Sequence, residues 1–237
     1  MNRLFAGALG AGAAALALHA SVARADVTFS AFGGDLAASA HFAQSGGDLV
    51  ITLTNTSPVD VDAPMDVLTA LFFDVNGPAL LLTPMSGVLG PGSTVLFDDP
   101  PPGGVGGGEW EYEDSFGAPA PHGAQYGISS AGFSLFGGGV MFPGPNLDPP
   151  PNVDGLNYGI TSAGDNPLTG NAAVTGGNPL IQNQVVFTLS GLPDGFDFGR
   201  IKRVNFQYGT DLTEPNIPEP VSALLLGLGG MLALRRR

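Results

Sequence analysis

The chain of 237 residues is predicted to be all-β, a single β-sandwich with long loops rich in Gly and Pro. Several segments alternate apolar and polar residues with a period of two, as half-buried strands do. Between the two terminal segments, no stretch shows a capped apolar stripe of helical spacing. About 195 residues remain there, enough for one sizeable core. The sequence therefore predicts one domain over residues 26–216.

The clearest predicted strand covers Gly47–Thr54. Its residues Leu49, Ile51 and Leu53 share one face, and turn residues follow from Asn55. The segment Val67–Phe73 is apolar on both faces, which is typical of a strand buried between packed layers. Further strands are expected on the apolar faces Leu36/Ala38/Ala40/Phe42, Val185/Phe187/Leu189 and Val204/Phe206/Tyr208, with weaker candidates at Val27–Phe32 and Phe133–Phe136.

The middle of the chain, about 98–180, is predicted to be rich in loops. Runs such as Pro100–Gly104 and Pro149–Pro151 interrupt helices and central strands. Disordered segments are poor in aromatic residues, whereas this region contains Trp110, Tyr112, Phe116, Tyr126, Phe133, Phe136 and Phe142. We therefore expect these loops to pack onto the sandwich.

Residues 1–25 have the three parts of a secretory signal peptide. A positive start at Arg3 precedes the apolar stretch Leu4–Ala20, and the small-x-small pattern Ala23-Arg24-Ala25 stands before Asp26. The pattern predicts an N-terminal signal helix, export through the Sec machinery and cleavage by signal peptidase between Ala25 and Asp26.

The C-terminal segment, residues 217–237, also has three parts: the motif Pro218-Glu219-Pro220, the apolar run 221–234, and Arg235, Arg236 and Arg237. The arginines are expected to hold the chain end on the cytoplasmic side of a membrane. A helix over the apolar run would span only ~21 Å, short of the ~30 Å hydrocarbon core. This hydrophobic helix is therefore predicted to contact the inner membrane transiently.

This C-terminal arrangement resembles the PEP-CTERM sorting signal of exported proteins in certain Gram-negative bacteria. In that family, a membrane-embedded exosortase reads Pro-Glu-Pro and cuts near it, which releases the protein to the cell surface or extracellular matrix. The body also resembles a family of exosortase-dependent surface proteins from about Phe29 onward, in stretches such as GDLVITLT and DVLTALFFDV. The resemblance implies a location and exosortase as a partner, but no reaction. An ordinary tail anchor is the alternative.

The charge of the processed chain is strongly negative. Cleavage at both ends leaves Arg200, Lys202 and Arg203 against 21 acidic residues if the C-terminal cut falls after Glu219, a net charge of about −18. A cut before Glu219 makes this charge one unit less negative. Such a charge repels nucleic acid and anionic lipid surfaces. Cysteine is absent, which excludes disulfides, thiolate metal sites and cysteine nucleophiles.

The segment from Glu109 to Asp114 sets carboxylates beside aromatic rings, a combination found in sugar-binding and glycosidase sites. Its candidate carbohydrate contacts are Trp110, Tyr112 and Glu111. In a strand, however, the glutamates would share one face and the rings the other. We therefore expect a solvated acidic face over a buried aromatic face, with a carbohydrate-binding surface as the alternative.

No metal, cofactor or catalytic residue is assigned from the sequence. Calcium is the cation to consider at three acidic clusters, but none fits a known calcium-loop pattern: Asp60/Asp62/Asp66, Asp98/Asp99 and Glu111/Glu113/Asp114. Of the two remaining histidines, His41 is expected to face solvent, and His122 lies in a Pro/Gly loop. A Gly-x-Ser-x-Gly motif is absent, so an enzyme is not expected.

The positive cluster Arg200/Lys202/Arg203 could bind an anionic polysaccharide, but we expect Asp194 and Asp197 to neutralise it. Two classes of function remain. The first is a non-enzymatic surface or matrix protein with a structural or adhesive role in exopolysaccharide or biofilm matrix. The alternative is a lectin-like module or weak glycoside-active protein. The sequence favours the first, with extracellular polysaccharide as a candidate partner.

Overall fold

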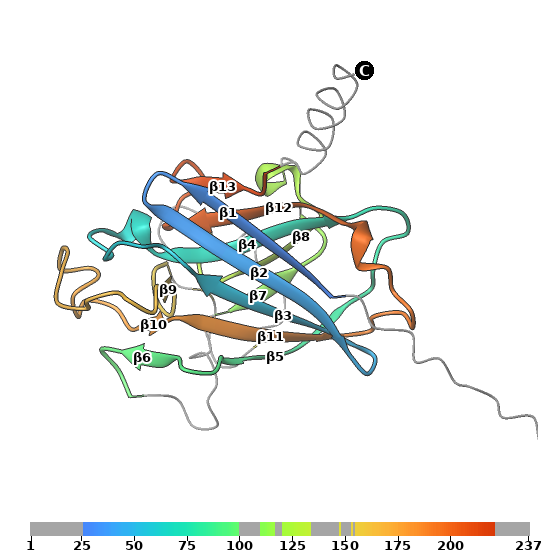
Figure 1. Ribbon diagram of the computed structural model, residues 1–237, viewed down its shortest axis with the longest axis horizontal. Helices are drawn as coiled ribbons and strands as arrows, with labels where there is room; N and C mark the ends of the chain where they lie inside the picture. The colour runs from blue at the N-terminus through green and yellow to red at the C-terminus, as the bar shows by residue number, and fades with distance from the viewer. Residues whose placement is uncertain are drawn as a thin grey trace, which may run out of the picture.

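The computed structural model describes residues 26–99, 110–116, 120–133, 147, 153 and 155–220. These residues form an all-β fold of two sheets (Figure 1), which confirms the predicted class. Their helical elements are 3-10 turns of three residues each, at Pro64–Asp66, Pro121–Gly123 and Phe198–Arg200. The helices expected at the two chain ends lie outside the described residues.

The smaller sheet is antiparallel throughout and has the strand order β1-β2-β3-β11-β5. Two consecutive hairpins join its first three strands, and β11, which comes late in the chain, pairs with β3. The strands are β1 (Val27–Gly33), β2 (Leu36–Ser45), β3 (Asp48–Asn55), β5 (Thr83–Leu89) and β11 (Gln184–Ser190).

The larger sheet has eight strands in the order β13-β12-β4-β9-β10-β6, with β8 pairing with β4, and β7 with β8. Only β9 and β10 pair in parallel among its described strands. The strands are β4 (Leu68–Val75), β6 (Thr94–Leu96), β7 (Glu111–Glu113), β8 (Tyr126–Ser129), β9 (Ile160–Thr161), β10 (Leu180–Gln182), β12 (Ile201–Tyr208) and β13 (Asn216–Pro218).

The period-two segments became strands with their apolar faces inward. Leu49, Ile51 and Leu53 of β3 are buried, and they lie opposite the buried apolar residues of β11. Strand β4 is buried along its whole length, as predicted for a segment that is apolar on both faces. The weak candidate at Val27–Phe32 is confirmed as β1, whereas Phe133 lies in a loop and 134–136 lie outside the described residues.

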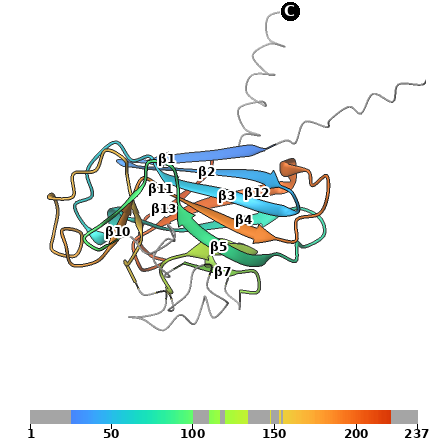
Figure 2. The same cartoon turned by 90° about the horizontal axis from the view of Figure 1, so that it is seen from below.

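The main core lies between the two sheets. Strands β1 and β2 lie over β4 and β12 (Figure 2), and Phe42 meets Phe73 edge-on with ring centroids 5.3 Å apart. Further along, the Trp110 ring lies 5.0 Å from that of Phe187. Each such buried side chain contributes about 1.5–3 kcal/mol, so a core of this size can hold the sandwich without disulfides.

The outer face of the larger sheet is covered as well. On this face Phe72 of β4 lies 6.0 Å from Phe116 and 5.9 Å from Phe133, measured between ring centroids. Both come from the loop-rich middle, which therefore packs onto the sheet as expected. Strand β4 is buried on both faces because this second layer covers the side that the smaller sheet does not.

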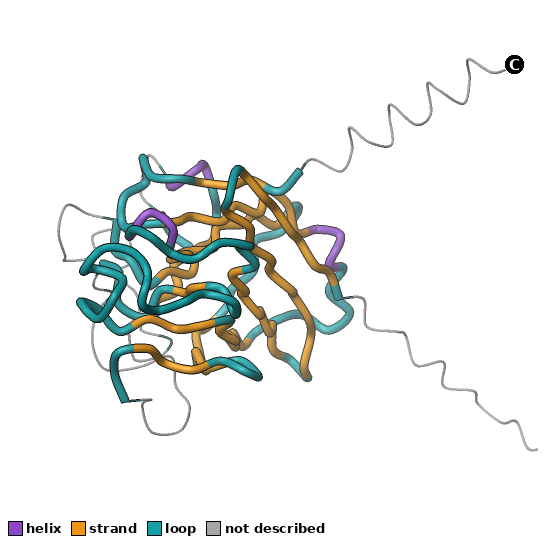
Figure 3. Tube along the Cα trace, turned by 60° about the vertical axis from the view of Figure 1, so that its left-hand side comes forward, coloured by secondary structure: helices purple, strands orange, loops and turns teal. Residues whose placement is uncertain are grey.

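Two long loops lie together at one end of the sandwich (Figure 3). One joins β3 to β4 and the other joins β9 to β10. The Val61 N–H donates to the Asp165 carboxylate at 2.8 Å, and the Asn171 N–H donates to the Asp62 carbonyl at 2.9 Å. Each loop therefore satisfies polar backbone groups of the other.

Candidate functional site

The Pro-Glu-Pro motif is partly built into the larger sheet. Pro218 is the last residue of β13, which lies across the predicted boundary between residues 216 and 217. The Glu219 N–H donates to the Val204 carbonyl at 2.8 Å, and the Tyr208 N–H donates to the Pro215 carbonyl at 2.9 Å. In an antiparallel ladder the alternate residues point their nitrogens away from the partner strand. The Pro218 nitrogen therefore faces away from β12, where a missing N–H breaks no bond.

The glutamate of the motif lies against the sheet. Its carboxylate accepts hydrogen bonds from the backbone N–H groups of Val204 and Arg203, and Lys202 lies near enough to attract it. Partial burial raises the pKa of Glu219, although Lys202 and these two hydrogen bonds act in the opposite direction. The flanking Pro218 and Pro220 are exposed. The only charged group of the motif is thus engaged by β12.

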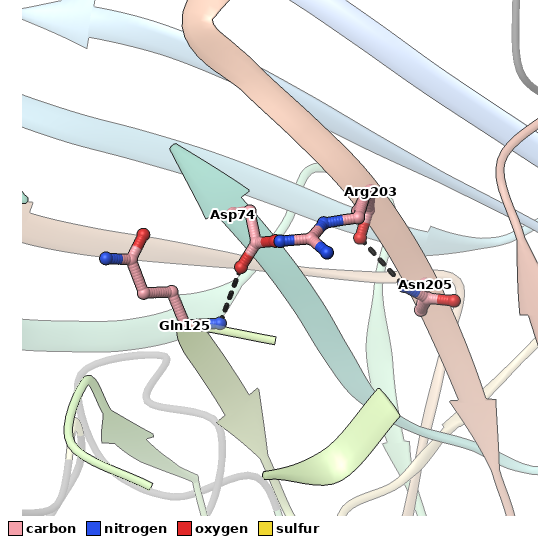
Figure 4. Close-up of polar contacts among 4 residues, drawn as sticks. All are labelled: Asp74, Gln125, Arg203 and Asn205. Atoms are coloured by element: carbon pink, nitrogen blue, oxygen red, sulfur yellow. Dashed lines mark hydrogen bonds and ion pairs between the residues drawn. The ribbon is translucent and has the colours of Figure 1, made fainter. Parts of the chain in front are cut away.

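A β-bulge in β12 provides these N–H groups. Lys202 pairs with Asp74 and Asn205 pairs with Phe72, so β12 carries one extra residue between the two pairs. Arg203 lies in the bulge and has a φ of 50°, a left-handed conformation that is uncommon outside glycine. The Asn205 side chain supports the bulge by donating to the Arg203 carbonyl at 2.7 Å (Figure 4).

On the other side of the bulge, β4 contributes a buried carboxylate. Asp74 is 5% exposed and forms an ion pair with the Arg203 guanidinium. Its other oxygen accepts the Gln125 backbone N–H at 2.6 Å (Figure 4). A buried carboxylate needs such partners, because an unpaired buried charge is strongly unfavourable. Asp74 and Glu219 therefore hold the bulge from opposite sides.

The predicted neutralisation of the basic cluster by Asp194 and Asp197 is wrong. Arg203 pairs with Asp74, and Asp197 instead accepts the Gly199 N–H at 2.9 Å, which caps a 3-10 turn. Arg200 donates to backbone carbonyls at 2.7 Å. Sheet pairing brings β12 beside β4, and this long-range contact outweighs proximity in sequence. The side chains of Arg200 and Arg203 are therefore already occupied by groups of the protein itself.

The predicted solvated acidic face at Glu109–Asp114 is also wrong. Glu111 and Glu113 of β7 are only 1% and 7% exposed, because loops cover the outer face of the larger sheet; Glu109 lies outside the described residues. Glu113 accepts the backbone N–H groups of Asp114 and Ser115 at 3.0 and 2.7 Å. These glutamates are structural carboxylates within the fold.

Glu111 is less well satisfied than Glu113. Burial raises the pKa of Glu111 to about 7, opposed by a hydrogen bond from the Val153 N–H and reinforced by the charge of Glu113. Its Oε2 finds no hydrogen-bond partner among the described residues. The proton thus stays on Glu111 to a higher pH than on an ordinary glutamate.

The candidate carbohydrate contacts do not form a sugar platform. Trp110 and Tyr112 are buried; the Trp110 ring packs on Phe187, and its Nε1 donates to the Tyr158 carbonyl at 3.2 Å. Stacking on a sugar requires an accessible ring face, and these rings are used by the main core. With Glu111 buried as well, the segment gives a ligand no access to the three predicted contacts.

Members of the acidic clusters accept hydrogen bonds from groups of the protein itself. Asp60 and Asp66 accept backbone N–H groups at 3.0 Å, and Asp98 accepts the Tyr158 hydroxyl at 3.0 Å. Across the ranges that the structure describes, no group of three His, Asp or Glu side chains is placed to hold a metal ion.

The two histidines lie far apart in the fold. His41 is partly exposed, with Thr28 Oγ1 2.9 Å from its Nδ1 and the Asp26 carboxylate 3.4 Å from its Nε2. His122 lies over the outer face of the larger sheet, where its Nε2 is 2.8 Å from Gln207 Oε1 and its ring packs against Phe72. The structure does not bring the two imidazoles into one site.

The remaining predicted site residues, Ala23, Ala25 and Arg235 to Arg237, lie outside the described residues, as does the apolar run 221–234. Within the part that is described, no helix has both the length and the apolar character needed to span a membrane. Searches against protein-family models, curated proteins and solved structures found no match to the chain.

Proposed function

We propose that this chain is an exported surface or matrix protein, released from the inner membrane by an exosortase and serving a structural or adhesive role among extracellular polysaccharide. The observation that carries the proposal is the order Pro218-Glu219-Pro220, apolar run, Arg235 to Arg237 at the chain end. The apolar run is too short for a stable anchor, so it serves as a transient hold during processing.

The described fold agrees with both processing sites. Strand β1 begins at Val27, immediately after the predicted signal peptidase site, and β13 ends at Pro218 within the motif. The strong negative charge of the processed chain favours solubility outside the cell.

Burial of Trp110, Tyr112 and Glu111 removes the surface on which the lectin-like alternative depended. We therefore retain a structural role, without catalysis, as the proposed activity of the domain.

Expression of the full chain in a host with and without exosortase tests the proposal. We expect secreted material that begins at Asp26 and lacks Arg235 to Arg237, as measured by intact mass spectrometry, only in the host with exosortase. Replacing the three arginines by lysines retains the positive charge and should preserve processing, whereas deleting them should abolish it. Native protein that keeps its final arginines in both hosts would show a tail-anchored protein instead.

A further inference from the structure

We infer that β13 is a latch that holds the backbone of the sorting motif against β12, so that the exosortase can read Pro218-Glu219-Pro220 only after β13 separates from β12. The inference rests on the proposed function and adds a control step to it. It predicts that the rate of processing depends on the stability of one edge strand.

The backbone of the motif is engaged by a neighbouring strand. Asn205, Phe206 and Gln207 of β12 pair with Pro218, Ile217 and Asn216 of β13. The Glu219 N–H continues this ladder by donating to the Val204 carbonyl. An enzyme that binds an extended peptide through its backbone needs the same groups. It therefore competes with β12 for them.

The side chains strengthen this latch. Ile217 is 6% exposed and belongs to the main core, where it lies against β1: a Cβ added at Gly33 would come 3.6 Å from Ile217 Cγ1. Glu219 turns its carboxylate toward the β12 bulge, where two backbone N–H groups bind it. The apolar side chain of Ile217 and the carboxylate of Glu219 thus both face the sandwich.

No linker separates the latch from the membrane segment. The apolar run begins at Val221, directly after Pro220, so the enzyme meets the motif at the edge of the folded domain. A strand of three residues at a sheet edge belongs to the parts of a protein that open locally at low free-energy cost. Local opening therefore exposes the motif while the rest of the sandwich stays folded.

The processing rate should then equal the intrinsic rate multiplied by the fraction of molecules in which β13 is open. Ile217→Ala weakens the latch without changing the motif. We expect it to speed processing about tenfold, which corresponds to about 1.4 kcal/mol of lost packing. Ile217→Val should produce a smaller increase and guards against failure of the alanine variant to fold. Leu189→Ala is the matched control, because Leu189 is equally apolar and fully buried but lies on β11 in the other sheet.

Processing in the exosortase host is followed by pulse-chase on the full chain, together with hydrogen exchange of the Glu219 amide in purified protein. The inference is supported by a protected Glu219 amide and by faster processing of both Ile217 variants than of wild type and Leu189→Ala. Equal rates in all four proteins would overturn the latch while leaving the proposed function intact. If Leu189→Ala speeds processing as much as the Ile217 variants do, processing is limited by global unfolding of the domain, and the latch is overturned. Absence of processing in every variant would remove the proposed function, and an unprotected Glu219 amide would overturn the latch whatever the processing result.

Discussion

Replacing Glu111 by glutamine should make the protein more stable above pH 7. Burial raises the pKa of Glu111 from 4.5 to about 7 in the folded state, whereas in the unfolded chain the group titrates near its ordinary value. Between these two values the folded protein holds a proton that the unfolded chain has released. The free energy of unfolding therefore falls as the pH rises through this window.

The size of the effect follows from the width of the window. Each pKa unit corresponds to 1.36 kcal/mol, so the wild type should lose about 3 kcal/mol between pH 4.5 and pH 7.5 through this one group. Glutamine remains neutral, and its carbonyl oxygen can still accept the Val153 N–H that now binds the carboxylate. The variant should thus match wild type near pH 4.5 and exceed it by up to about 3 kcal/mol at pH 8.

Urea unfolding at pH 4.5 and pH 8 measures this difference. Trp110 is the single tryptophan and is fully buried beside Glu111, so its fluorescence reports unfolding. The control is Asp35→Asn, which removes one negative charge from an exposed turn and corrects for the general effect of net charge. If Glu111→Gln and wild type lose the same stability between the two pH values, the assignment of a protonated, buried Glu111 is wrong.

Three further predictions test the packing and charge pairing of the fold. A double-mutant cycle of Asp74→Asn and Arg203→Met, measured by urea unfolding, should give a coupling energy of about 1 kcal/mol. The coupling is this small because the Arg203 side chain is 71% exposed and solvent weakens the ion pair. Zero coupling would exclude a stabilising ion pair. Gly127→Ala should lower the free energy of unfolding by about 1–3 kcal/mol, since the added Cβ would come 2.7 Å from one phenylalanine ring and 2.9 Å from another. An unchanged melting temperature would show that the outer layer is loosely packed. Gly170→Ala should lower the free energy of unfolding by at least about 2 kcal/mol, because the φ of Gly170 is +90° and an added Cβ would lie 2.7 Å from two backbone carbonyl oxygens. The control is Gly164→Ala, because an added Cβ there meets nothing within 4 Å. Equal melting temperatures of the two variants would contradict the described loop contact.

The sequence alone was enough to identify the all-β class and several of the strands. Alternation in β2, β3 and β11 is a local property of the chain, since successive side chains of a strand point to opposite faces. The apolar run in β4 likewise indicated a strand covered on both faces. The proposed signals at the two ends also depend only on the order of neighbouring residues, and they remain predictions.

Short strands could not be recognised in this way. A strand of two or three residues, such as β6, β9, β10 or β13, is too short to show a period. It exists because a longer strand is placed beside it and pairs with its backbone. The position of the Pro-Glu-Pro motif at the end of β13 is therefore a result of the fold, which residue order could not indicate.

The environment of each charge was likewise set by the tertiary structure. Glu111 and Glu113 alternate with aromatic residues as an exposed acidic face would, yet loops cover them because the larger sheet carries a second packed layer. Arg203 pairs with Asp74 because β12 lies beside β4. Which faces of the strands are apolar can be read from the order of neighbouring residues. Which carboxylates lose water, and which cations lie beside them, depends on contacts between segments that are distant in the chain, and these contacts exist only in the folded protein.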